Sequence, residues 1–187
     1  MRYFYIHPFR PQYFFQKECR KYSLFRTFFQ PYTIKGAISW WLYWHTSLYS
    51  LIFSKKNIEK YVPELRLRSI IGNNAVLAIN AGSPGPEQKI TLIGLHNDTP
   101  FFSKYARTET AIKLVENERV ALTTIKGKGV APDILDHFSG TKISYIKTEF
   151  MIGKRVSIDL IDEKIISLLK KISLLDVMDC FHVNSTL

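Results

Sequence analysis

Residues 80–86, with the sequence NAGSPGP, constrain the fold of this 187-residue chain more than any other segment. Two glycines and two prolines among seven residues can continue neither a helix nor a strand. The apolar run at 75–79 must therefore end there, and the run at 89–95 begins a new strand. A tight turn at 96–99 then leads back along 100–106, which predicts an antiparallel hairpin.

A helix and a second hairpin follow these three strands. Thr108 or Thr110 can cap the helix at its N-terminus, and the helix is predicted to run to about Lys126, just before glycine residues. Residues 130–135 and 142–148 are predicted to form two further strands. The expected fold class is α+β, with an antiparallel five-stranded sheet and one packed helix.

The predicted helix carries one carboxylate on its apolar face. Glu118 lies four residues after Leu114 and four before Leu122, whereas Glu116 is turned by about 200° from Glu118 and is expected to face solvent. A carboxylate directed at the sheet needs a cationic partner, or it would be neutral. Lys104 on the preceding strand is the available cation, so the sequence predicts an ion pair. The alternative that stays open is a solvated lysine and a glutamate at the edge of the stripe.

The order of these elements and their residues resemble the small N-terminal lobe of kinase-like phosphotransferases, closest to the aminoglycoside phosphotransferase and choline kinase branch. The resemblance covers about residues 70–160 and rests on FFSK at 101–104, NERVALTTI at 117–125 and GVAPDIL at 129–135. It implies that Lys104 binds nucleotide phosphates and that Glu118 orients this lysine, as in kinases generally.

The resemblance also implies a hinge and a phosphate loop. Glu149, Phe150 and Met151 correspond to the hinge, whose backbone groups meet adenine. Gly82 and Gly85 would let the loop backbone approach phosphate. Two prolines in the same loop remove amide donors, so an ordinary hairpin turn stays an alternative. ATP and Mg²⁺ are the expected ligands, while no residue is assigned as catalytic or as a metal ligand.

The resemblance divides the chain into three parts. Residues 1–69 are a basic, aromatic-rich and helical extension, 70–156 the kinase-like lobe, and 157–187 a C-terminal helix and tail that would begin a truncated catalytic lobe. A helix is expected at 159–175. The catalytic aspartate, the asparagine and the metal-binding aspartate of the family lie in the second lobe. Intact relatives would transfer the γ-phosphoryl group of ATP to a hydroxyl of a small molecule or saccharide, and this chain alone is expected not to turn over ATP.

The first 60 residues need a separate explanation. They hold ten basic against two acidic residues and 18 of the 26 aromatic residues. The uncharged stretch at 36–54 predicts an amphipathic helix, with Ser39 and Tyr43 on a polar stripe and three tryptophans opposite. Those tryptophans are Trp40, Trp41 and Trp44. They either pack on the rest of the fold or lie at an anionic membrane surface, and both alternatives stay open.

Several other classes of function are disfavoured. Cys19 and Cys180 are too few for a disulfide framework or a zinc site, and the five histidines show no ligand or triad spacing. This usage favours a cytoplasmic location, with membrane-peripheral association as the alternative. A nucleic-acid partner is disfavoured because no recognised motif accompanies the basic residues. The rival to a phosphotransferase is a non-enzymatic membrane or scaffold protein. Self-association is expected if apolar surface is left uncovered.

Overall fold

The computed structural model describes residues 3–6, 12–29, 31, 33–46, 53–55, 58–59, 61–72, 74–129, 131–151 and 167. The helix expected at 159–175 and the rest of the predicted C-terminal part therefore lie outside the described residues, apart from residue 167.

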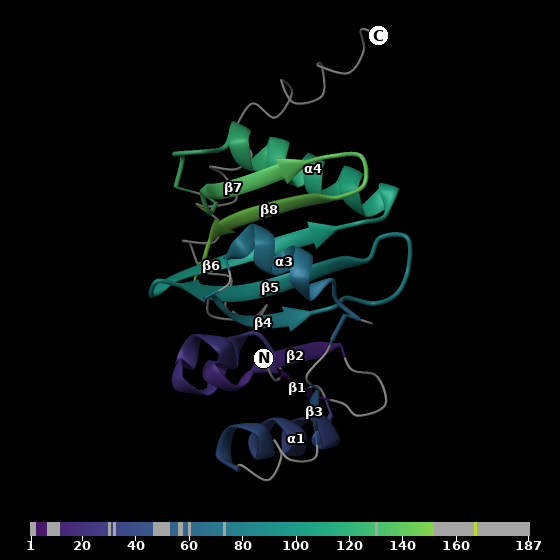
Figure 1. The fold of residues 1–187 in the computed structure, drawn as a ribbon. Coiled ribbons are helices and arrows are strands. Elements are labelled where there is room, and N and C mark those ends of the chain that lie inside the picture. The colour runs from purple at the N-terminus through teal and green to yellow at the C-terminus, as the bar shows by residue number, and fades with distance from the viewer. Residues whose placement is uncertain are drawn as a thin grey trace, which may run out of the picture.

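The described residues form an α+β fold around one antiparallel sheet (Figure 1). Its eight strands follow the order β3-β1-β2-β4-β5-β6-β8-β7. Their bounds are β1 Tyr3–Ile6, β2 Tyr13–Gln16, β3 Ser54–Lys55, β4 Val76–Asn80, β5 Lys89–His96, β6 Thr99–Ala106, β7 Ile134–Ser139 and β8 Ser144–Glu149. The prediction of five strands is therefore wrong, because three more strands come from the first third of the chain.

Those three strands also correct the expectation of a helical N-terminal extension. Tyrosine and phenylalanine are strong strand formers, and the aromatic runs at 3–6 and 13–16 pair with each other in register. Phe14 and Phe15 are both fully buried, each in a different hydrophobic cluster, so the run fills both faces of the sheet. Strand β2 pairs with β4, so one sheet contains strands from both sides of the boundary predicted at residue 69.

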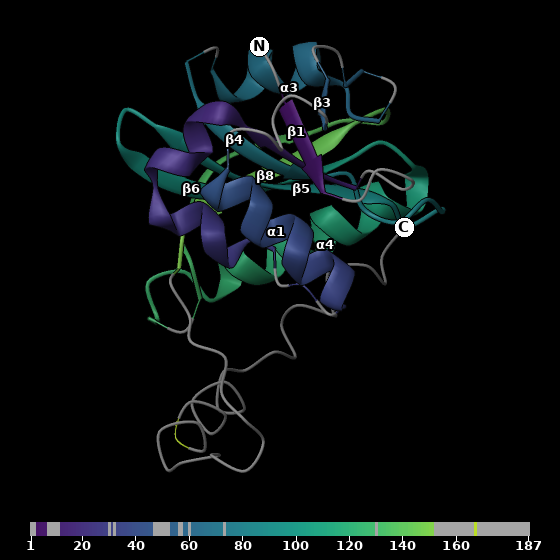
Figure 2. The ribbon, with the colours of Figure 1, turned by 90° about the horizontal axis from the view of Figure 1, so that it is seen from below.

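Helices cover both faces of the sheet (Figure 2). One face packs against α3 (Glu64–Ile71) and is called the α3 face. The other packs against α4 (Glu109–Thr124), α1 (Ile34–His45) and two short 3₁₀ helices, η1 (Lys17–Lys21) and η2 (Ser23–Thr27), and is called the α4 face. The packed helix predicted for residues 70–156 is α4, and helices from the first third of the chain cover the sheet as well.

Helix α1 is shorter than the helix predicted at 36–54, and its buried and exposed sides differ from the predicted ones. It begins at Ile34, where Thr33 accepts a hydrogen bond from the Gly36 amide at 3.1 Å, and ends at His45. Tyr43, placed on the polar stripe by the sequence, is fully buried, whereas Trp41 is exposed. Of the helices that the structure describes, none is long and apolar enough to cross a membrane.

A buried polar network joins the N-terminal strands to the rest of the sheet. The Gln16 side chain accepts a hydrogen bond from the Leu77 amide and donates one to the Tyr3 hydroxyl, both at 3.0 Å. The Arg68 guanidinium of α3 donates to the same hydroxyl at 2.7 Å, and the Tyr43 hydroxyl of α1 donates to the Gln16 carbonyl at 3.2 Å. The Gln16 side chain thus extends the hydrogen bonding between β2 and β4 at the point where the backbone leaves β2 and enters η1.

Candidate functional site

Lys104 and Glu118 form the ion pair that the sequence predicts. The Lys104 Nζ atom of β6 donates to the Glu118 Oε1 atom of α4, and the side chains are 25% and 31% exposed. That pairing is confirmed.

The local geometry explains how the two side chains meet. Alternate residues of β6 face α4, so Lys104 shares a face with Ala106, which is fully buried against the helix. On α4, Ala111 and Val115 are buried in the same hydrophobic cluster. Glu118 lies on the same side of the helix, because the three positions are spaced i, i+4, i+7. The helix therefore directs the carboxylate of Glu118 over the middle of β6.

Glu116 does not face solvent, which corrects the prediction made for it. Its carboxylate accepts hydrogen bonds from Ser139 Oγ at 2.7 Å, from Arg119 Nε at 2.9 Å, and from Ser144 Oγ. Burial would raise the pKa of this carboxyl, but the bonds from Ser144, Arg119 and Ser139 outweigh it and hold the pKa below its ordinary value of 4.5. The position of Glu116 was predicted wrongly because α4 contacts β7 and β8 as well as β6, so more than one side of the helix is covered.

The β4–β5 loop holds the two glycines singled out in the sequence. Gly82 has a φ of 72°, and a Cβ atom there would lie 2.4 Å from the Lys89 carbonyl oxygen, so only glycine fits. The Asn80 side chain accepts from the Gly82 amide at 2.9 Å and closes the turn. The loop lines an open cavity of about 500 Å³ that includes Gly82, Gly85 and Thr91.

One row of paired residues connects this loop with the ion pair. Across β4, β5 and β6, Asn80 pairs with Thr91, and Thr91 pairs with Lys104. Directly paired residues of antiparallel strands point to the same face. With strands about 4.8 Å apart, the loop begins roughly 10 Å from Lys104 on the α4 face.

The register of this row is fixed by a close glycine contact. Gly94 pairs with Phe101, and a Cβ atom at Gly94 would lie 2.0 Å from the Phe101 ring. The turn of the same hairpin has positive φ at Asn97 and Asp98, 50° and 60°, as in the two-residue turns that match the twist of strands. These two features together hold Thr91 opposite Lys104.

A single side chain joins the loop to α4. The Thr108 Oγ1 atom caps the helix by accepting a hydrogen bond from the Ala111 amide at 3.3 Å. The same hydroxyl donates to the Pro86 carbonyl oxygen at the end of the loop. The loop and the helix that carries Glu118 are thereby connected.

The predicted hinge residues are only partly available. The Glu149 amide donates to the Asp133 carbonyl oxygen at 3.0 Å, so it is already bonded. Phe150 is partly buried and packs against the hydrophobic cluster on the α4 face, and Met151 is 60% exposed. Of the three hinge residues, Phe150 and Met151 are therefore the ones that can offer backbone groups to a ligand.

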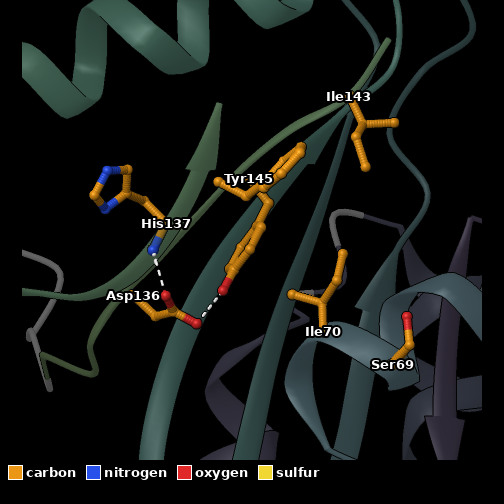
Figure 3. Close-up of a pocket in the computed structure, with 7 residues that line it drawn as sticks. Ser69, Ile70, Asp136, His137, Ile143 and Tyr145 are labelled. Atoms are coloured by element: carbon orange, nitrogen blue, oxygen red, sulfur yellow. Dashed lines mark hydrogen bonds between the residues drawn. The ribbon is translucent and has the colours of Figure 1, made fainter. Parts of the chain in front are cut away.

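A second cavity, of about 470 Å³, lies on the α3 face between α3 and the β7–β8 hairpin (Figure 3). Tyr145 donates its hydroxyl hydrogen to Asp136, which also accepts from the His137 amide at 2.8 Å. Burial, together with the bond to Asp136, raises the pKa of Tyr145. The His137 ring points away from Tyr145, so this histidine does not take part in the Tyr145–Asp136 pair. No feature of the sequence predicted it.

Similarity to known proteins and metal-ligand geometry indicate no other site. No family model, curated protein or solved structure matches this chain. Within the part of the chain that the structure describes, no group of three or more histidine, cysteine, aspartate or glutamate side chains could hold a metal ion. The ion pair and the adjoining loop are therefore the candidate site with the most defined chemistry.

Proposed function

We propose that residues 76–151 act as the nucleotide-binding lobe of a kinase-like phosphotransferase, with ATP as the ligand. The observation that carries the proposal is the ion pair between Lys104 on the third strand of this unit and Glu118 on the helix that follows. In protein kinases a third-strand lysine binds the nucleotide phosphates and pairs with a glutamate of the next helix.

The chemistry of the pair suits a phosphate ligand. A lysine ammonium has three donors, and Glu118 uses one of them. The other two can bond phosphate oxygens, and such charge-assisted bonds are stronger than neutral ones. Because Glu118 lies on the rigid helix α4, it would hold the ammonium in place before the ligand arrives.

The β4–β5 loop supports the same proposal. It connects the first and second strands of the unit, which is where kinases carry the glycine-rich loop over the phosphates. The amides of Ser83 and Gly85 have no hydrogen-bond acceptor among the described residues, whereas Pro84 and Pro86 have no amide hydrogen. The loop could therefore offer fewer amides to phosphate than a loop without proline.

Adenine would lie beside Phe150, where the backbone of Phe150 and Met151 can form hydrogen bonds. The described residues do not fit a resident Mg²⁺ ion, since they include no group of three or more histidine, cysteine, aspartate or glutamate side chains that could hold one, and we assign no step to a metal. The resemblance places the groups that position a phosphate acceptor in the second lobe. The proposal therefore concerns nucleotide binding, and the absence of ATP turnover by this chain alone stays a prediction.

Titration calorimetry with ATP tests the proposal on matched variants. Lys104→Ala should weaken binding at least about tenfold, because it removes charge-assisted bonds, and Glu118→Gln should weaken it by a smaller factor. Lys113→Ala is the control, since this lysine of α4 is 71% exposed and pairs with Glu109 instead of Glu118. Equal affinities for the intact chain and Lys104→Ala would refute the proposal. No binding by the intact chain would favour a non-enzymatic scaffold.

A further inference from the structure

Helix α1 presents an apolar face to solvent. Ile34, Ile38 and Trp41 are 81%, 55% and 57% exposed, and their spacing of i, i+4, i+7 places them on one side of the helix. They are three of the seven large hydrophobic side chains that are exposed among the described residues. These three side chains form one exposed apolar surface, here called the α1 face.

The orientation of this face is fixed by the packing on the other side of α1. Tyr43 is fully buried, and the Trp40 ring lies 5.1 Å from that of Phe15 and 5.6 Å from that of Tyr43, between centroids. The Arg26 guanidinium lies over the Trp44 ring at 4.9 Å. These contacts leave Ile34, Ile38 and Trp41 pointing away from the core.

The charge around the α1 face is strongly positive. Helix α1 has no acidic residue, and Lys35 lies at the edge of the face. The 3₁₀ helices beside α1 (Figure 2) carry the exposed Lys17, Lys21 and Arg26 against one acidic residue, Glu18. Across residues 1–60, ten basic residues stand against two acidic ones. A tryptophan and two isoleucines on a helix without acidic residues, in a strongly basic part of the chain, are what the headgroup zone of an anionic bilayer accommodates.

We infer that the α1 face docks on an anionic lipid bilayer, with Ile34, Ile38 and Trp41 entering the boundary between headgroups and acyl chains. Helix α1 then lies parallel to the membrane surface, and the basic side chains contact anionic headgroups. This inference is independent of the nucleotide site, because α1 packs at the β1 end of the sheet.

Co-sedimentation with vesicles containing 30% anionic phosphatidylglycerol tests the inference on the full chain. The double variant Ile38→Ser/Trp41→Ser should bind at least about fivefold more weakly than the wild type. Leu135→Ser/Phe138→Ser is the matched control, because these residues are 47% and 48% exposed on β7, at the other end of the sheet. The control should bind like the wild type, and vesicles of neutral phosphatidylcholine should bind all three proteins weakly.

Tryptophan fluorescence gives a second readout, in which the wild-type chain is measured with and without vesicles. The anionic vesicles should shift the emission to the blue, and Trp41→Phe should abolish most of the shift, since Trp40 and Trp44 already pack in the core. Recovery of the wild type in the supernatant with anionic vesicles would overturn the inference. Undiminished binding by the α1 double variant would also overturn it. The inference would also be overturned if the wild type formed a dimer that the α1 double variant dissociates and bound no vesicles.

Discussion

Glu116 and Glu118 lie two residues apart on α4 and have different partners. Glu118 pairs with the single cation Lys104, whereas Glu116 accepts hydrogen bonds from one arginine and two serines. Glu116 thereby joins α4 to β7 and β8. At the scale of residues we therefore expect Glu116 to matter for stability and Glu118 for ligand binding.

The stability that Glu116 contributes should depend on pH. Because its pKa is lowered by folding, its contribution is present above its ordinary pKa of 4.5 and is lost as pH falls below that value. Glu116→Gln should lower the free energy of unfolding by about 1 to 2 kcal/mol at pH 7, and by progressively less as the pH falls through the lowered pKa of Glu116. Urea denaturation at several pH values measures this. A loss that is the same at pH 7 and pH 3 would contradict the assignment.

At the scale of elements, the β4–β5 loop and α4 are linked through Thr108. This link combines a helix cap with a bond to the Pro86 carbonyl. The two roles can be separated, because aspartate caps a helix well but cannot donate a hydrogen bond when ionised.

Thr108→Val should lower the free energy of unfolding by about 1 kcal/mol, because the cap is lost. Thr108→Asp should keep most of the stability and still release the loop. Hydrogen exchange followed by mass spectrometry should then show faster exchange at residues 82–88 in Thr108→Asp. Unchanged exchange in this variant would show that the bond to Pro86 does not restrain the loop.

Elements with a clear hydrophobic period, or with turn and capping residues at their ends, were predicted well. Hairpin β5–β6, helix α4 and hairpin β7–β8 follow from the turn at 80–86, the Thr108 cap and the later glycines, with bounds shifted by a few residues. Strands β1 and β2 were missed because consecutive aromatic residues such as Phe14 and Phe15 fill both faces and show no alternation. The partners of Glu116 could not be predicted, since no pattern places Ser139 and Ser144 beside α4.

At the scale of the whole molecule, the sheet is continuous from β3 to β7. The first third of the chain contributes three of its strands and, through Gln16, a buried polar network with Leu77 and Tyr3. Charge and aromatic content differ sharply along the sequence, but the structure packs both parts into shared hydrophobic clusters.

The described parts should therefore unfold together. All three tryptophans lie in the first third of the chain, whereas far-ultraviolet circular dichroism reports on every element. Urea transitions followed by the two signals should coincide, as expected for a two-state protein. Gln16→Leu should move both to lower urea, because it leaves the Leu77 amide without its partner. A fluorescence transition at lower urea than the dichroism transition would show that residues 1–69 form a separate unit.

The central claim, that Lys104 faces the phosphates of a bound nucleotide, is tested most directly by covalent labelling. An adenosine that carries a lysine-reactive sulfonyl fluoride in place of the phosphates should modify the lysine nearest the phosphate position, and peptide mass spectrometry identifies it. We expect Lys104 to be the main labelled residue and excess ATP to suppress the labelling. Labelling spread over exposed lysines such as Lys113 and Lys142, without protection by ATP, would contradict the account.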